Sequence, residues 1–312
     1  MREQAEQFEP EIREMAAYCL ESSGKRLRPT LVFFSGWRGD GVVDESLVKA
    51  AGVLEMVHLA TLVHDDIMDL AELRRNRQTA SRKFGPDAAV LLGDALFSQA
   101  LHVAAQFPTP EVCRLVSAST RRVCSGEIMQ TLRRRDFTVS LEEYRRMIDL
   151  KTAELFRVSC YLGAMLSAQA PGFADAADRF GHHLGIAYQI YDDLVDFLGE
   201  EKQIGKTLGT DLATGKLTLP LMLLLEKLSA TERASIVMAL RDGRSPGLLA
   251  SQQRMQELGV GVAVVQSIDN EISAALAALE PFAGVAATPL LRQLAALLQR
   301  QIAKLPALAV SR

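Results

Sequence analysis

Two long segments, residues 46–70 and 173–198, constrain the fold of this 312-residue chain more than any other feature. Both have helix-forming compositions, and their apolar residues continue nearly all the way around the helix, interrupted in the first segment by Glu55, His58 and His64. A helix that is apolar on every side must be surrounded by other helices. The two segments therefore predict an all-α fold with two buried central helices.

The rest of the chain predicts further helices and almost no strands. The aromatic content is only 6%, which disfavours sheets. Helix start signals lie at Thr109-Pro110, Ser140–Glu143, Ser229–Glu232 and Thr288-Pro289. We expect roughly ten to thirteen helices. No low-complexity linker divides the chain, so residues 1–312 are expected to form a single all-α domain, one large helical bundle around a central cavity.

Composition and charge argue against several functional classes. A net charge of −3 disfavours a nucleic-acid-binding protein. The N-terminus lacks the apolar core of a signal peptide, and the unbroken apolar runs are far shorter than the roughly 20 residues of a membrane span. The four cysteines lack metal-binding spacing and suit a reducing compartment. We therefore expect a cytoplasmic protein that is not integral to a membrane.

Two clusters of aspartates, each following an apolar helical run, are the first chemical signal. They are Asp65, Asp66 and Asp69 in the first long segment, and Asp192, Asp193 and Asp196 in the second. A spacing of four residues puts two carboxylates on one helix face, where they repel each other unless a cation neutralises them. One such motif is more often a solvated helix end; the repetition favours a site for Mg²⁺, which bridges carboxylates to substrate phosphates.

Separate groups of cationic residues accompany the aspartates. They are Lys25, Arg26 and Arg28 in the segment GKRLRP, the pair Arg74-Arg75, Lys151 in the pair KT, and Lys206 and Lys216 in a Gly-rich loop. Lysine and arginine are the usual ligands of phosphate. Aspartate pairs alone would suit a metal store, but aspartate pairs with cationic groups indicate metal-bridged diphosphates.

Taken together, these residues resemble the trans-isoprenyl diphosphate synthases, which form the polyprenyl synthetase family. The shared motifs are GKRLRP, His58, LVHDDIMD with the following RR, the FG…GDALF stretch of residues 84–97, GE at 126–127, KT at 151–152, YQIYDDLVDF, and GKTLGTD with GKLTLP. They run from residue 24 to residue 220 in the family's order and spacing. The chain departs from the family at Asn76, where Gly is usual after the arginine pair, and at Ser81, where Asn is usual.

The resemblance implies a prenyltransferase that condenses isopentenyl diphosphate head-to-tail with an allylic diphosphate, and it implies a homodimer. Ionisation, condensation and loss of a proton would depend on Mg²⁺, with roughly three ions when substrate is bound. The implied metal ligands are Asp65, Asp69, Asp192 and Asp196. The implied catalytic residues are Asp65, Asp66, Asp69, Asp192, Asp193, Lys151 and Lys206. The allylic diphosphate would bind Arg74, Lys151, Thr152, Gln189, Lys206 and Lys216. Isopentenyl diphosphate would bind Lys25, Arg28, His58 and Arg75.

Product length is predicted from the helix before the first aspartates. One isoprene unit is about as long as one helix turn, roughly 5 Å, so the growing tail meets Thr61 first, with Val57 one turn further; the resemblance adds Ala60. Because these residues are small, we expect a product longer than the farnesyl class, about C25–C40, which partitions into membranes.

Two alternatives stay open. A floor formed by another helix, with Phe97, Phe107 or Met129 as candidates, would give a short-chain farnesyl or geranylgeranyl synthase. The chain could also be a non-catalytic regulatory subunit of a heteromeric synthase, although such subunits tend to lose an aspartate motif. A terpene cyclase would lack the isopentenyl site at Lys25 and Arg28.

Overall fold

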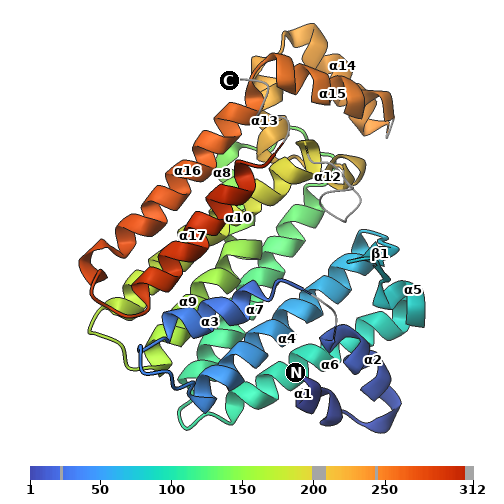
Figure 1. The fold of residues 1–312 in the computed structure, drawn as a ribbon. Helices are drawn as coiled ribbons and strands as arrows, with labels where there is room; N and C mark the ends of the chain where they lie inside the picture. Colours follow the sequence, from blue (N-terminus) through green and yellow to red (C-terminus); the bar gives the residue numbers. More distant parts are fainter. Residues whose placement is uncertain (22–23, 199–208, 243–244, 306–312) are drawn as a thin grey trace. The chain divides into compact units, whose positions relative to one another are not determined.

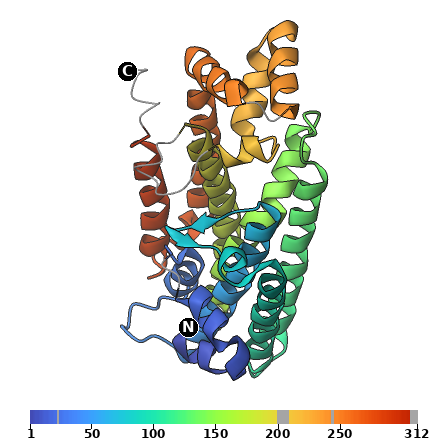
Figure 2. The same cartoon turned by 90° about the vertical axis from the view of Figure 1, so that its right-hand side faces the viewer.

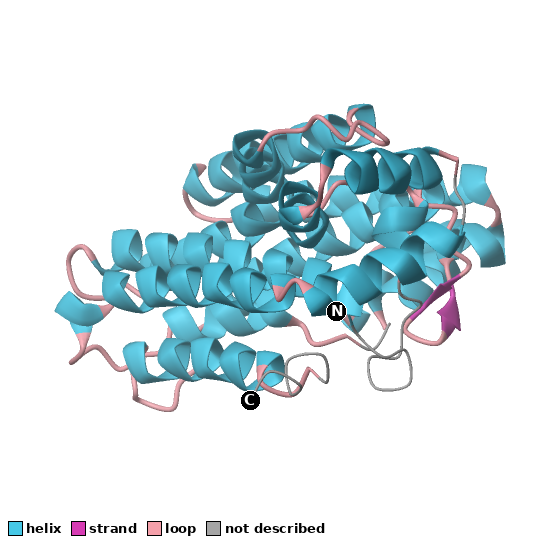
Figure 3. Ribbon diagram, turned by 90° about the horizontal axis from the view of Figure 1, so that it is seen from above, coloured by secondary structure: helices cyan, strands magenta, loops and turns pink. Residues whose placement is uncertain are grey.

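The computed structural model describes residues 1–21, 24–198, 209–242 and 245–305, and within them the chain is almost wholly helical (Figure 1, Figure 3). The prediction of an all-α fold is therefore confirmed. The described residues form sixteen α-helices, more than the ten to thirteen expected. Helices of five residues or fewer account for the excess, because they are too short to show a helical periodicity. These are α1 (Arg2–Glu6), α5 (Ala80–Phe84) and α12 (Thr210–Ala213).

Contacts divide the chain into two compact units, which are described separately. Unit 1 comprises residues 1–121, 158–178 and 284–290; unit 2 comprises residues 122–157, 179–283 and 291–312. Four helices contribute residues to both: α7 (Glu111–Leu132), α9 (Glu154–Leu166), α10 (Phe173–Leu198) and α17 (Thr288–Ile302). The expectation of a single domain stays a prediction.

Unit 1 is built around α4 (Glu45–Met68), which packs mainly against α6 (Pro86–Ala105) and α3 (Leu27–Ser35) (Figure 1). The helix begins where the Asp44 carboxylate accepts the Ser46 backbone N–H, and twelve of its 24 residues are buried, as its apolar sequence predicted. Both α4 and α6 are long and apolar enough to cross a membrane, a property that buried core helices share. Helix α2 (Pro10–Leu20) also lies wholly within unit 1.

Unit 2 contains a series of shorter helices. They are α8 (Leu141–Ile148), α13 (Leu219–Lys227), α14 (Ala230–Arg241), α15 (Ser245–Glu257), α16 (Val260–Ala278), and the 3₁₀ turn η2 (Glu280–Phe282). Capping boxes at Ser140–Glu143 and Ser229–Glu232 begin α8 and α14, which confirms two of the predicted start signals. Helix α16 packs against α13 and α15.

A short hairpin follows α4, seen as the pair of arrows in Figure 2. Strands β1 (Leu73–Arg74) and β2 (Arg77–Gln78) pair antiparallel through a two-residue connection. Its residues, Arg75 and Asn76, have φ of 54° and 60°, and positive φ at both positions is typical of a type I′ turn. Asparagine tolerates this left-handed conformation better than other non-glycine residues. The family's glycine at position 76 can therefore be replaced by asparagine with little strain.

A π-helical turn, η1 (Asp149–Ala153), interrupts the chain between α8 and α9 and carries Lys151 and Thr152. Two glycines let neighbouring backbones approach it. A Cβ on Gly126 of α7 would lie 2.7 Å from the Lys151 backbone nitrogen, and one on Gly185 of α10 would lie 2.6 Å from the Ala153 Cα. These separations are shorter than real Cβ contacts, so only glycine fits at either position.

We expect Gly185→Ala to lower the free energy of unfolding by about 1–3 kcal/mol, because the added methyl group forces the turn away from α10. Gly52→Ala in α4 is the matched control: nothing lies within 4 Å of its added Cβ, and alanine should stabilise the helix there by about 0.5–1 kcal/mol. Urea unfolding of both variants measures the difference. Equal stability of the two variants would contradict the close approach.

Candidate active site

The first aspartate motif lies at the C-terminal end of α4. Asp65 and Asp69 are one turn apart on the same face, and both are partly exposed. The helix ends because Leu70 adopts a left-handed conformation with φ of 53° and the Ala71 N–H returns to the Asp66 carbonyl at 2.9 Å. This ending presents two carboxylates beside the following hairpin.

Unlike the partly exposed Asp65 and Asp69, Asp66 is buried, and it forms an ion pair with Arg74 of β1. The Arg74 Nε lies 2.8 and 3.0 Å from the two Asp66 oxygens, and a terminal nitrogen lies 2.7 Å from one of them. Asp66 is buried, and burial raises the pKa of its carboxyl while the hydrogen bond and charge of Arg74 lower it. In this structure Asp66 therefore fixes Arg74, which the sequence assigned to the allylic diphosphate.

The residues predicted to bind isopentenyl diphosphate lie together within unit 1. The Arg75 guanidinium rests against Gly24, where an added Cβ would be 2.2 Å from it, and Gly24 immediately precedes the exposed Lys25. Burial, together with the nearby Arg28, Arg75 and Arg74, lowers the pKa of His58 well below its ordinary value. His58 is thus neutral at pH 7 among cations, an environment suited to an anionic ligand.

Glu55 was expected from the sequence only to interrupt the apolar face of α4. Glu55 is buried one turn before His58, and its Oε2 makes no hydrogen bond. Burial raises the pKa of its carboxyl, and Arg28, Arg26 and Arg75 lower it. Its position three residues before His58 could have identified Glu55 as a neighbour of the predicted isopentenyl diphosphate site, since residues so spaced share a helix face.

The predicted chain-length residues form a stripe on α4 below Asp65. Thr61 is partly exposed, and its hydroxyl donates to the His58 carbonyl at 2.7 Å. Val57, one turn further, and Ala60 are both buried. None of these three residues is aromatic. Of the three, Thr61 is the residue that shares both the face and the partial exposure of Asp65.

In unit 2, the π-helical turn positions Lys151 and Thr152. The Lys151 ammonium forms an ion pair with Glu127 of α7 and donates to the Gln130 side-chain oxygen at 2.9 Å. Glu127 belongs to the GE motif, and its neighbour Gly126 lets α7 approach the backbone of the π-helical turn closely. Gln130 lies one turn from the motif on the same helix and was not predicted as a site residue.

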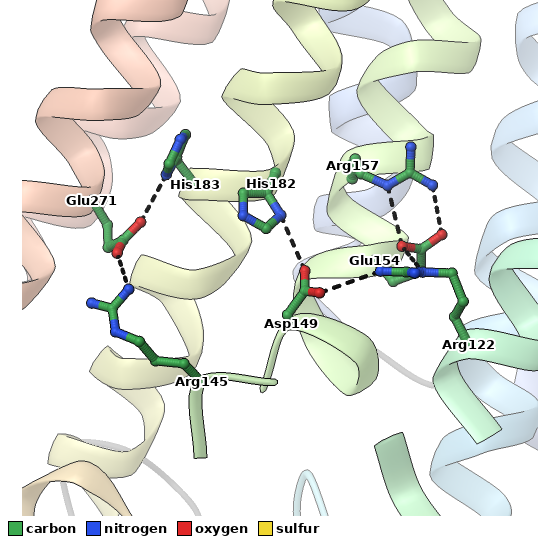
Figure 4. Close-up of polar contacts among 8 residues, drawn as sticks. All are labelled: Arg122, Arg145, Asp149, Glu154, Arg157, His182, His183 and Glu271. Carbon is green, nitrogen blue, oxygen red and sulfur yellow. Dashed lines mark hydrogen bonds and ion pairs between the residues drawn. The ribbon is translucent and has the colours of Figure 1, made fainter. Parts of the chain in front are cut away.

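Ion pairs hold both ends of this turn (Figure 4). At its start, Asp149 lies 3.1 Å from His182 of α10 and 3.2 Å from Arg122 of α7. Just beyond its end, the fully buried Glu154 lies 2.8 Å from Arg122 and 2.6 Å from Arg157. The hydrogen bond from His182 contributes most to lowering the pKa of Asp149. These contacts are independent of any ligand and fix the backbone that carries Lys151.

The three aspartates of the second motif have different surroundings. Asp192 is partly exposed. Asp193 is buried; its two oxygens accept the Tyr144 hydroxyl at 2.6 Å and the Gln189 amide at 2.7 Å. The Gln189 oxygen in turn accepts the Thr152 hydroxyl at 2.6 Å. The structure therefore connects Asp193, predicted as a catalytic residue, with Thr152 and Gln189, both predicted to bind the allylic diphosphate.

Asp196 is buried and accepts the Thr210 hydroxyl and the Asp211 backbone N–H, both at 3.0 Å. These bonds hold the start of α12. Asp211 also lies 3.6 Å from Lys216, which follows Gly215 at a positive φ of 75°. Lys206 lies outside the described residues.

The oxygen donors of both motifs suit a hard divalent cation. Among the described residues, no three acidic, histidine or cysteine side chains converge on one point. Mg²⁺ does not require this, because it binds one or two carboxylates and completes its shell with water and substrate phosphates. Asp65, Asp69 and Asp192 offer partly exposed carboxylates of this kind. Asp196 would join them only by giving up its two bonds to α12.

Comparison with known proteins gives one consistent family. The polyprenyl synthetase family model matches residues 9–251. Heptaprenyl diphosphate synthase component 2 of Bacillus subtilis is 39% identical over 214 residues, covering 68% of this chain and 61% of that protein. Octaprenyl diphosphate synthase of Escherichia coli is 31% identical over 270 residues, covering 86% of this chain and 83% of that protein. The match thus spans less than two thirds of the Bacillus relative.

The fold is similar to that of solved structures as well. A polyprenyl synthase from Caulobacter crescentus, complexed with calcium and isoprenyl diphosphate, superposes with a TM-score of 0.89 at 27% identity, covering 97% of this chain and 92% of that one. The family model covers far more than half of the chain. The motifs quoted from the sequence, the helical fold and these matches agree, and the chain belongs to the polyprenyl synthetase family.

Proposed function

We propose that this chain is a trans-prenyltransferase that condenses isopentenyl diphosphate with an allylic diphosphate. The observation that carries the proposal is the end of α4, where the partly exposed Asp65 and Asp69 lie on the helix that also fixes Arg74 through Asp66. Carboxylates for a divalent cation and a guanidinium for phosphate thus meet at one helix end. Binding of a metal-bridged diphosphate is the chemistry that uses both.

The allylic carbon–oxygen bond breaks first, and the diphosphate leaves with the electron pair. Asp65, Asp69 and Asp192 would hold Mg²⁺, which when bound would offset the negative charge on this leaving group. Arg74, Lys151, Lys206 and Lys216 neutralise the remaining charge on its oxygens, which lowers the barrier electrostatically. We propose roughly three ions in the substrate complex.

The second substrate binds on the cationic cluster of unit 1. Lys25, Arg28 and Arg75 pair with the diphosphate of isopentenyl diphosphate, and the neutral His58 donates a hydrogen bond to it. Its double bond attacks the allylic cation, forming the new carbon–carbon bond. A proton then leaves to the released diphosphate. Thr152 and Gln189 place a hydroxyl and an amide dipole near the cation and stabilise it without trapping it.

We propose a product longer than the farnesyl class, about C25–C40. The absence of a bulky residue at Ala60, Thr61 and Val57 supports this range, and the names of the Bacillus and Escherichia relatives, heptaprenyl and octaprenyl diphosphate synthase, fall within it. Such a product partitions into membranes, while the enzyme itself is proposed to be cytoplasmic.

We propose that the chain acts as a homodimer. The Bacillus relative favours a second candidate, because that protein is named as component 2 of its synthase. In this candidate the chain supplies the catalytic component and needs a second polypeptide for turnover. Light scattering of the purified chain, measured beside its activity, separates the two: an active dimer supports the first, and an inactive chain that still binds diphosphate with Mg²⁺ supports the second.

Incubation of the purified chain with labelled isopentenyl diphosphate, Mg²⁺ and allylic primers of increasing length tests the reaction itself. We expect Mg²⁺-dependent incorporation of label into an extractable prenyl product. The same incubation with EDTA is the control. If no primer is extended, and the chain binds no prenyl diphosphate either, the proposal is wrong.

Thr61→Phe tests the proposed direction of chain growth. The aromatic ring would fill the stripe one turn before Asp65, so we expect the main product to become shorter, read by chromatography of the dephosphorylated prenols. Ala60→Phe should act in the same direction. Leu62→Phe, which places the same aromatic ring about 100° around α4, is the control and should leave the product length unchanged. An unaltered product from Thr61→Phe and Ala60→Phe would place the floor on another helix.

A further inference from the structure

Tyr144 of α8 is a buried polar residue to which the proposed mechanism gives no task. It is 3% exposed, and its hydroxyl donates to Asp193 Oδ2 at 2.6 Å. Burial, reinforced by the neighbouring charge of Asp193, raises the pKa of its phenol well above the ordinary value. The hydroxyl therefore stays protonated at every working pH and acts toward Asp193 as a permanent donor.

The hydrogen bonds beyond Tyr144 form one chain within unit 2. Asp193 Oδ1 accepts the Gln189 amide nitrogen at 2.7 Å, and the Gln189 oxygen accepts the Thr152 hydroxyl at 2.6 Å. Gln189 and Asp193 are four residues apart in α10, while Thr152 lies in the π-helical turn. The chain thus ends at the residue proposed to face the allylic cation.

The direction of every bond in this chain follows from Asp193. Its two oxygens accept the Tyr144 hydroxyl and the Gln189 NH₂ group, so the Gln189 oxygen is turned toward Thr152. The Thr152 hydroxyl must then donate to Gln189. Its remaining lone pairs, the negative end of its dipole, are left to face the reacting centre. If Gln189 flipped, the Thr152 proton could turn outward and oppose the positive charge of the substrate.

We propose that Tyr144 and Asp193 are positioning residues that fix the polarity of the Thr152 hydroxyl, so that its oxygen lone pairs face the allylic cation. Tyr144 anchors the carboxylate, and the carboxylate sets the orientation of the Gln189 amide. The inference rests on the proposed function. Asp193 is accordingly a support for Gln189 and not a metal ligand.

Steady-state kinetics of Tyr144→Phe test the proposal. The variant keeps the ring but loses the anchor, and we expect kcat to fall about 10- to 100-fold, the usual cost of misplaced catalytic groups. KM for isopentenyl diphosphate should not change, because that substrate binds on other residues. Tyr161→Phe removes a hydroxyl from α9 in unit 1 and should leave both constants unaltered.

A double-mutant cycle separates positioning from general structural support. Thr152→Val removes the hydroxyl whose direction is being set, so adding Tyr144→Phe to it should cause no further loss of kcat. Independent, multiplicative losses would overturn the proposal, as would a Tyr144→Phe variant with wild-type kcat.

Proton NMR gives a readout that needs no turnover. A short, buried phenol–carboxylate hydrogen bond should give a slowly exchanging downfield resonance in the wild type that is absent from Tyr144→Phe. Its absence from the wild type would contradict the chain of bonds. A wild type that shows the resonance but makes no prenyl product and binds no prenyl diphosphate would instead contradict the proposed function, so the two failures are distinguishable.

Discussion

The negative charge of a carboxylate at the end of a buried helix must be neutralised by a cation or stabilised by hydrogen-bond donors. The rest of the site depends on which partner each carboxylate has. Burying an unpartnered charge costs several kcal/mol. Asp66 is offset by Arg74, Asp193 by Tyr144 and Gln189, and Asp196 by the start of α12. Asp65, Asp69 and Asp192 remain partly exposed. The buried aspartates thereby hold the cationic and polar groups in place, while the partly exposed ones are the proposed ligands of the metal.

The π-helical turn is likewise held in place by contacts within the protein. Lys151 and Thr152 are adjacent in sequence, yet the proposed mechanism directs Lys151 at phosphate and Thr152 at a carbocation. Their backbone is fixed by two glycines and by the ion pairs of Asp149 and Glu154. A turn held this firmly from both ends keeps the two side chains in a constant relation, which electrostatic catalysis requires.

Much of the fold could be predicted because its signals are local. Helix α10 was predicted with its observed bounds, and α4 to within two residues at its C-terminal end, because continuous apolar sequence and a following break mark such helices. The capping boxes at Ser140 and Ser229 were equally local. The short helices were missed because four or five residues show no periodicity.

The hydrogen-bond partners could not be predicted, since they depend on residues distant in sequence. Tyr144 and Asp193 are 49 residues apart, and Arg122 and Glu154 are 32 apart. Nothing in the sequence around Tyr144 distinguishes it from a packing residue, and nothing around Asp149 announces a π-helical turn. Asn76 shows the converse: a departure from the family in sequence becomes understandable once its positive φ is known.

Calorimetric titration of the purified chain with inorganic diphosphate tests the central claim most directly, because it needs neither a primer nor turnover. The account predicts tight binding with Mg²⁺, little without it, and a large loss of the Mg²⁺-dependent part in Asp65→Asn but not in Asp87→Asn, which alters an exposed aspartate in the first turn of α6. Binding that is equally strong without Mg²⁺, or unaffected by Asp65→Asn, would contradict it.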